Sequence, residues 1–319
     1  MPGAADLALA NRWQRGFPLE PRPFGLIARE TKLAEGDVLA QFTELKRQGV
    51  IDRVGPVFRP NTVGASSLAA IAVPPERLAG VAALVSEHPG VNHNYEREHR
   101  YNLWFVVTGR DANAVEETIR TLEEATGLRV LRLPLLEEFH VDLGFDLQSG
   151  NAPRAAAPES FPPLSPAERK LVAATGAGLP LVAAPYAAVS RQLGIPESEV
   201  LELLRTMLAD GRIRRIGAVV RHRRLGYDAN AMAVWDVPDG QVAALARRLA
   251  RDPAVTLCYR RARALPDWPY NLYCMVHGRL RSVVAGEIDR LAAALGLDAF
   301  PHAVLFSNRC FSQRAARYG

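Results

Sequence analysis

The sequence repeats itself once, and this internal repeat limits the possible folds more than any other feature. "GFPLEPRPF" at 16–24 matches "GLPLVAAPY" at 178–186, and "RQGVIDRVGPVFR" at 47–59 matches "ADGRIRRIGAVVR" at 209–221. Both matches have the same offset of 162 residues. A repeat of this kind predicts two structural copies of one unit. The 319 residues are enough for about two domains of ordinary size.

Each copy opens with the pattern of a winged helix-turn-helix. In the second copy Pro196 precedes a run in which Val200, Leu204 and Met207 recur at helical spacing. Gly211 follows where the helix should end. A shorter helix precedes this one after a turn, and "RIRRIGAVVR" then has the pattern of a β-wing. The first copy repeats this order.

After the wing, each copy has the order strand, helix, two strands, helix, strand. This βαββαβ order is the ferredoxin-like plan. We therefore predict an α+β fold, a tandem repeat of a winged helix-turn-helix plus a ferredoxin-like domain. The predicted bounds are 16–60 and 167–225 for the helix-turn-helix domains, 61–146 and 226–319 for the ferredoxin-like domains, and 147–166 for a linker rich in Pro, Ala and Ser.

Composition excludes several protein classes. No apolar run approaches the roughly 20 residues of a membrane-spanning helix, and the N-terminus lacks the pattern of a secretion signal. Cys258, Cys274 and Cys310 are odd in number and lack CxxC spacing, so disulfides and a zinc site are not expected and the cytoplasm is the expected location. A net charge of +5 indicates an anionic partner, either nucleic acid or a small polycarboxylate.

The segment "HNYEREHRYNLWFV" at 93–106 is too polar for an ordinary strand of a sheet. Alternation places His93, Tyr95 and Arg97 on one face and leaves polar residues on the other as well. A single strand histidine is more often structural than catalytic, and Trp104 is expected in the core. Convergence of histidine, arginine and tyrosine here, and of arginine and tyrosine at 257–270, instead indicates a site for a large anion with flat surfaces.

A duplicated DNA-binding regulator is the alternative reading of the same fold. The recognition helices carry acidic residues such as Glu199 and Glu202, which suits phosphate-rich DNA poorly. The basic wing residues keep this alternative open, as DNA contacts, a solvated face or a subunit contact. They are Arg212, Arg214, Arg215, Arg221, Arg223 and Arg224.

Four motifs resemble the siroheme decarboxylases, a family with an Lrp/AsnC-like fold. They are the segment at 93–106, "EEFHVDLGFDL" at 137–147, "LCYRRARALPDWPYNLYCMVHG" at 257–278 and "LFSNRCFSQRAARYG" at 305–319. The resemblance is to the D and L subunits, here fused. It implies removal of carbon dioxide from the acetates at C12 and C18 of siroheme, giving 12,18-didecarboxysiroheme for haem d1 synthesis. It implies no separate cofactor or protein-bound metal, because the iron belongs to the substrate. The alternative function for a protein with this fold is a DNA-binding regulator that senses a tetrapyrrole.

The resemblance also implies roles for individual residues. His93 and His99 would form the acid–base pair, and His277 is left between a structural and a site role. Two positions depart from the family pattern, since Leu257 stands at the equivalent of His93 and Ser312 stands where a lysine is usual. A homodimer and a complex with related subunits are the expected assemblies, with no DNA or membrane partner. The expected substrate-binding residues are Tyr95, Arg97, Arg100, Tyr259, Arg260, Arg261 and Arg263.

Overall fold

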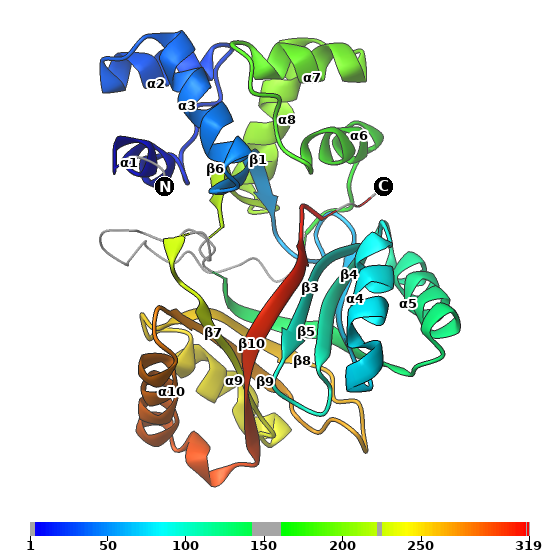
Figure 1. The fold of residues 1–319 in the computed structure, drawn as a ribbon. Coiled ribbons are helices and arrows are strands. Elements are labelled where there is room, and N and C mark those ends of the chain that lie inside the picture. The colour runs from blue at the N-terminus through cyan, green and yellow to red at the C-terminus, as the bar shows by residue number, and fades with distance from the viewer. Residues whose placement is uncertain (1–3, 142–160, 222–224, 317, 319) are drawn as a thin grey trace. The chain divides into compact units, whose positions relative to one another are not determined.

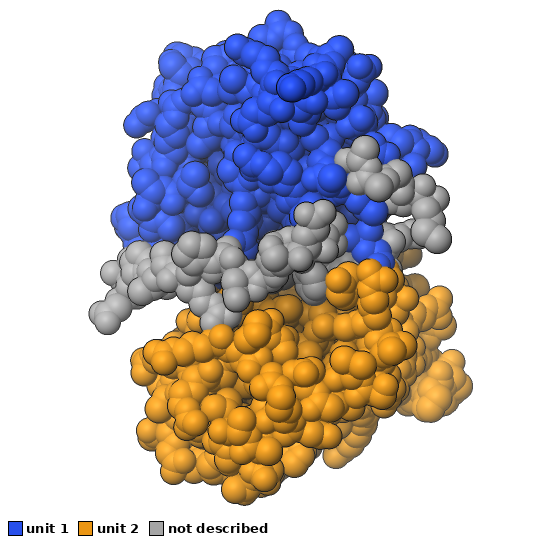
Figure 2. Space-filling view, turned by 90° about the vertical axis from the view of Figure 1, so that its left-hand side faces the viewer, with its two compact units in different colours: residues 1–65, 144–225, 315–319 blue, residues 66–143, 226–314 orange. Residues whose placement is uncertain are grey.

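The computed structural model describes residues 4–141, 161–221, 225–316 and 318. Residues 147–160 of the predicted linker, and Arg223 and Arg224 of the wing, lie outside the described residues. The chain divides into two compact units, coloured separately in Figure 2. Unit 1 comprises 1–65, 144–225 and 315–319, and unit 2 comprises 66–143 and 226–314. Each unit therefore takes segments from both halves of the repeat.

Unit 1 contains the two helix-turn-helix segments, and their wing strands pair with each other. β1 and β6 form a two-stranded antiparallel sheet in which Gly55 lies opposite Gly217. The helices pack around one apolar core that includes Phe42, Tyr186 and Leu204. The elements are α1 (Ala4–Arg12), α2 (Pro23–Thr31), α3 (Glu35–Arg47), β1 (Ile51–Phe58), α6 (Pro166–Thr175), α7 (Pro185–Leu193), α8 (Glu197–Ala209) and β6 (Ile213–Val220).

Helix α1 precedes the predicted start of the first helix-turn-helix at residue 16 and belongs to the same core. Leu9 and Trp13 are buried there, and the Trp13 carbonyl accepts a hydrogen bond from the Ala218 amide at 2.8 Å. Gly217 is needed beneath this segment, because a Cβ would come within 2.4 Å of the Trp13 carbonyl oxygen. The N-terminal segment thus lies directly on the wing strand of the second half.

Unit 2 is a closed eight-stranded barrel with its helices outside, which confirms the α+β tandem fold. The strand order is β10-β3-β4-β2-β5-β8-β9-β7. Figure 1 shows α4 and α5 beside one half of the barrel and α9 and α10 beside the other. The elements are β2 (Ala65–Ile71), η1 (Pro75–Arg77), α4 (Leu78–Glu87), β3 (Val91–Arg97), β4 (Leu103–Gly109), α5 (Ala112–Thr126), β5 (Val130–Val141), β7 (Ala229–Trp235), α9 (Asp239–Leu249), β8 (Val255–Arg261), β9 (Leu272–Gly278), α10 (Arg281–Leu295), η3 (Leu297–Ala299) and β10 (His302–Gln313).

The last strand of each half closes the barrel by pairing with the other half. β5 pairs with β2 of its own half and with β8 of the second half. In the same way β10 pairs with β7 and with β3 of the first half. Both strands have 12 residues, and an edge of that length would leave many backbone groups unpaired. The exchange pairs these edges within one chain.

The inner face of the barrel, meaning the strand face that points away from the helices, is aromatic at one end. We call this the aromatic end, defined by Tyr101, Trp104, Trp268 and Tyr273, which share one buried cluster. The indole N–H of Trp268 donates a hydrogen bond to the Tyr273 hydroxyl at 2.7 Å. Trp268 comes from the segment that is five residues longer in the second copy, so this longer segment adds a buried indole to the inner cluster.

The repeated "YN" dipeptide has a structural explanation in both halves. Asn102 accepts a hydrogen bond from the Val73 amide and donates one to the Val73 carbonyl, both at 2.9 Å. Asn271 holds Val237 in the same way, at 3.0 and 2.9 Å. Each asparagine therefore fixes the chain where it leaves the first strand of its ferredoxin-like repeat.

Replacing Asn271 with alanine is expected to destabilise the protein by about 1–3 kcal/mol, because the buried Val237 amide loses its acceptor. The free energy of unfolding, measured by urea denaturation, tests this. Asn113→Ala, at an exposed position in α5, serves as the matched control and should change stability by less than about 0.5 kcal/mol. Equal effects of the two substitutions would contradict the structural role of Asn271.

Candidate active site

Strand β3 places His93, Tyr95 and Arg97 on the inner face. The alternate residue Asn94 is fully buried on the helix side, where its amide donates to the Ala82 carbonyl and the Ser86 hydroxyl of α4, both at 3.0 Å. On the inner side, His93 Nδ1 lies 3.2 Å from the Tyr95 hydroxyl. The Arg97 guanidinium lies 5.7 Å from the centre of the Tyr95 ring. The alternation predicted from the sequence is thus present in the strand.

Strand β8 carries a matching pair, Tyr259 and Arg261. The Arg261 guanidinium lies 5.2 Å from the Tyr259 ring centre, and its Nη1 donates to the Leu133 carbonyl at 2.9 Å. Arg97 Nη1 donates to the Leu305 carbonyl at 3.2 Å. Leu133 and Leu305 occupy equivalent positions in β5 and β10, so each arginine is held by the strand that crosses over from the other half.

Burial lowers the pKa of the Arg261 guanidinium, because the charged form loses hydration. Among the described residues, no carboxylate forms an ion pair with it. Its partners are a carbonyl and the rings of Tyr259 and Tyr273. A half-buried guanidinium in these surroundings would be stabilised by an anionic ligand, and its planar donors suit a carboxylate.

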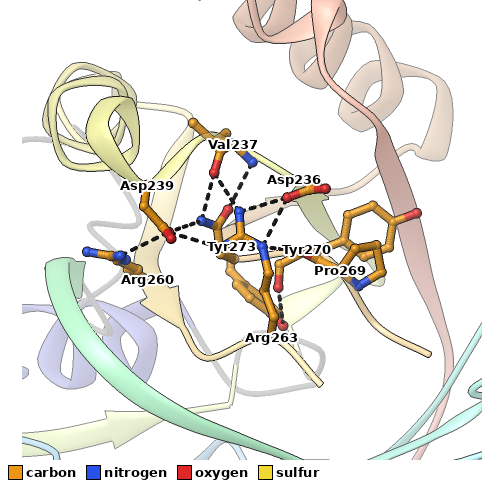
Figure 3. Close-up of polar contacts among 9 residues, drawn as sticks. Asp236, Val237, Asp239, Arg260, Arg263, Pro269, Tyr270 and Tyr273 are labelled. Carbon is orange, nitrogen blue, oxygen red and sulfur yellow. Dashed lines mark hydrogen bonds and ion pairs between the residues drawn. The ribbon is translucent and has the colours of Figure 1, made fainter. Parts of the chain in front are cut away.

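Arg260 and Arg263 lie elsewhere and already have carboxylate partners. Arg260 has the opposite strand phase from Arg261, and its Nη2 lies 3.0 Å from Asp239 Oδ1. Arg263 forms ion pairs with Asp236 at 2.8 Å and Asp239 at 2.9 Å and donates to the Val237 and Pro269 carbonyls (Figure 3). Hydrogen bonds from Arg263 hold the pKa of Asp239 below its ordinary value. This network fixes the loop after β7.

His99 and Arg100 belong to the turn between β3 and β4, at the aromatic end. The ring of His99 meets that of Trp268 edge to face at 5.2 Å, and its Nδ1 accepts the Tyr101 amide hydrogen at 3.0 Å. Arg100 is exposed and lies over the Tyr101 ring. His93 and Arg97 are four positions apart in the strand, about 13 Å, and His99 follows Arg97. The structure therefore does not bring His93 and His99 together.

The opposite end of the barrel, where β3 and β8 begin and β4 and β9 finish, we call the His93 end. His277 lies there near the end of β9, with its Nδ1 2.8 Å from the Thr256 hydroxyl. Tyr273 and Met275, which precede it at alternate positions, both contact the inner cluster. Sequence reasoning left His277 between two roles, although the alternation in "YNLYCMVHG" already gives it the inward phase.

Metal-binding geometry is not found in the described part of the chain, where no three His, Cys, Asp or Glu side chains gather. None of the helices described there has both the length and the apolarity that crossing a bilayer requires.

The inner face offers two Tyr–Arg pairs, with a histidine beside the first. Chemically it can hold two separate carboxylates of a large planar ligand and exchange a proton near one of them.

Models of known domains identify the class of protein. An AsnC-like ligand binding domain matches residues 63–140 and 224–312. A siroheme decarboxylase NirDL-like HTH domain matches residues 6–51 and 168–214. The chain is thus a tandem Lrp/AsnC-like protein in which both domains occur twice.

Known relatives are similar either over the full length of the chain or over about half of it. The siroheme decarboxylase NirDL subunit of Paracoccus pantotrophus is 44% identical over 316 residues, which cover 98% of this chain and 96% of that protein. The NirD subunit of Stutzerimonas stutzeri is 48% identical over 144 residues, 45% of this chain and 95% of that protein. A crystal structure of the siroheme decarboxylase NirDL in co-complex with an iron-uroporphyrin III analogue has a TM-score of 0.69 at 29% identity, covering 98% of this chain and 94% of that one. The chain belongs to the siroheme decarboxylase NirDL family.

The surroundings of His99 predict a loss of stability below neutral pH. Burial, with a smaller contribution from Arg100, lowers the pKa of His99 below its ordinary value of 6.5. The unfolded chain then binds more protons, so the free energy of unfolding should fall as the pH drops through about 6.5 toward the folded pKa. His88, whose pKa burial also lowers, acts in the same direction. The free energy of unfolding is measured by urea denaturation at pH 7.5 and 5.5, about one unit to each side of the ordinary histidine pKa. It should change less between these two pH values in His99→Gln than in wild type. An unchanged pH dependence would contradict this assignment.

Proposed function

We propose that this protein decarboxylates siroheme, converting two acetate side chains to methyl groups and giving 12,18-didecarboxysiroheme for haem d1 synthesis. The observation that supports this most directly is the duplicated Tyr–Arg pair on the inner face of a barrel in a member of this family. The two arginines are held by equivalent carbonyls, so they present two matched cation sites to one ligand. A tetrapyrrole with several carboxylates is a ligand of that kind.

In the proposed mechanism, Arg97 and Arg261 bind carboxylates, with Tyr95 and Tyr259 alongside them. When carbon dioxide leaves an acetate, its electron pair passes into the macrocycle, which serves as the electron sink. A proton must then reach the methylene carbon, and in this proposal His93, whose Nδ1 lies 3.2 Å from the Tyr95 hydroxyl, supplies it. We propose that no separate cofactor is needed, since the iron and the conjugated ring both belong to the substrate.

A DNA-binding role is supported less well by unit 1. The two wing strands pair with each other. Their arginines also have internal partners, since Arg212 forms ion pairs with Glu168 at 2.7 Å and Asp210 at 2.6 Å, and Arg221 pairs with Asp52 at 2.6 Å. Charges already neutralised in this way contribute little to phosphate binding. We therefore propose that unit 1 holds the two halves together rather than reading DNA.

Related subunits of this enzyme are known separately as NirD, NirL and NirH. We propose that the fused chain acts as a homodimer or in a complex with such subunits. No disulfide joins any two of the three cysteines, all of which lie in the described part of the chain. This is compatible with the reducing cytoplasm that we propose as the location of the protein.

Substituting His93 tests the proton-transfer role. Anaerobic incubation of the wild-type protein with siroheme should release two molecules of carbon dioxide per siroheme. Mass spectrometry of the tetrapyrrole measures this loss. His93→Gln is expected to slow at least one of these steps by roughly 10²–10⁴-fold. The exposed His302 at the start of β10 provides the control, and His302→Gln should keep the wild-type rate. Absence of any mass loss with wild type, even with related subunits present, would reject the function.

Arg261 and Arg260 are sequence neighbours with opposite predicted roles. Arg261→Gln should raise the KM for siroheme by roughly 10- to 100-fold, because a charged hydrogen bond to the substrate is lost. Arg260→Gln should leave KM within about threefold of wild type, since that guanidinium binds Asp239 instead. Steady-state kinetics of the two variants decide the matter, and a larger effect at Arg260 would refute the assignment to the inner face.

A further inference from the structure

The two halves of the barrel carry their histidines at non-equivalent positions. His93 in β3 corresponds to Leu257 in β8, so the second half lacks a histidine beside its Tyr–Arg pair in that strand. His277 in β9 corresponds to Thr108 in β4. Both histidines lie at the His93 end of the barrel, because β3 begins there and β9 finishes there. Among the residues that the structure describes, each half thus has one inward-phase strand histidine at this end, on a different strand of the repeat.

His277 is a close neighbour of the position that Leu257 occupies. Leu257 pairs directly with Met275 of β9. His277 is two residues further along the same face, so it is the diagonal neighbour of Leu257. Residues in this relation have Cβ atoms about 7–8 Å apart, within reach of a long or aromatic side chain. The imidazole of the second half is therefore displaced by one strand and remains beside the same part of the inner face.

The hydrogen bonds around His277 define which nitrogen can exchange a proton. The Thr256 hydroxyl donates its hydrogen to the Met275 carbonyl at 3.0 Å. In that arrangement the hydroxyl oxygen accepts from His277 Nδ1, which lies 2.8 Å away. The matching tautomer carries its hydrogen on Nδ1 and leaves Nε2 as the nitrogen that exchanges a proton. Thr256 occupies the bulge between Val255 and Leu257, an irregularity of the kind that re-aims side chains next to active sites.

We propose that His277 is the proton donor of the second half, so that His93 and His277 serve two different acetates of the bound tetrapyrrole. This inference rests on the proposed function. In each step the bond between the acetate methylene and its carboxylate breaks, and carbon dioxide leaves. The electron pair stays with the macrocycle and takes one proton from the histidine, which leaves a methyl group. Water returns that proton to His277 Nε2, so the step needs no oxidant or reductant.

The two histidines come from strands that are not neighbours. β10 and β7 lie between β3 and β9, so three strand spacings, about 14 Å along the wall, separate the two backbones. Both side chains point inward, so the imidazoles face a bound ligand from different parts of the wall. This arrangement suits a macrocycle that carries its reacting groups on different rings.

Single-turnover experiments on histidine variants test the proposal. Wild type, His93→Gln, His277→Gln and the control His302→Gln are each mixed with siroheme under anaerobic conditions. Products are separated by chromatography and weighed by mass spectrometry. We expect the His93 and His277 variants each to accumulate a product that has lost a single carbon dioxide, and the two products to be different regioisomers. The affected step should slow by roughly 10²–10⁴-fold in each.

Moving the histidine of the second half from β9 to β8 provides a second test. His277→Thr copies the residue found at 108, and adding Leu257→His copies the arrangement around His93. The double variant should recover the second decarboxylation at least about tenfold over His277→Thr alone, since the imidazole returns to the same part of the inner face. This pair also carries the test if His277→Gln does not fold, as judged by circular dichroism.

Three results would overturn the proposal. His277→Gln could complete both decarboxylations at the wild-type rate, the His93 and His277 variants could accumulate the same regioisomer, or the double variant could show no recovery. A wild-type protein that binds siroheme but releases no carbon dioxide would instead refute the proposed function itself. The two failures are therefore distinguishable in one set of measurements.

Discussion

Exchange of the edge strands between the two halves is the interaction on which the rest of unit 2 depends. β5 and β10 each complete the four-stranded sheet of their own half and also pair with the edge strand of the other half. β5 pairs with β8, and β10 pairs with β3. Backbone groups that would face solvent at two long edges are paired instead. Closure also turns one face of all eight strands inward, so residues of both halves line a shared interior that neither half would enclose alone.

The same exchange positions the candidate site. Arg97 is held by the Leu305 carbonyl of β10, and Arg261 by the Leu133 carbonyl of β5. Each guanidinium is therefore fixed by backbone from the opposite half, next to a tyrosine of its own strand. Fusion of two related subunits into one chain keeps these partners together at every protein concentration, as a loosely associated pair of separate subunits would not.

Duplication has preserved structural residues more strictly than the residues of the inner face. Asn102 and Asn271 hold Val73 and Val237 with the same two hydrogen bonds, because the loop that each one fixes is needed in both copies. On the inner face, His93 has diverged to Leu257 while the Tyr–Arg pair is retained. Carboxylate binding can be symmetric on a ligand with many carboxylates, whereas proton transfer must match the particular atoms that react.

Much of this protein was determined by the sequence by itself. The repeat and the βαββαβ order predicted the tandem fold, and strand alternation correctly placed His93, Tyr95 and Arg97 on one face, because these patterns depend on local periodicity. Tertiary structure alone decided which arginines form ion pairs with carboxylates of the protein and which histidines lie close together. Arg260 and Arg263 lie beside Asp236 and Asp239, and His99 lies against Trp268 at the other end of the barrel from His93. Such separations and pairings arise when segments far apart in the sequence come into contact, so the local sequence pattern does not predict them.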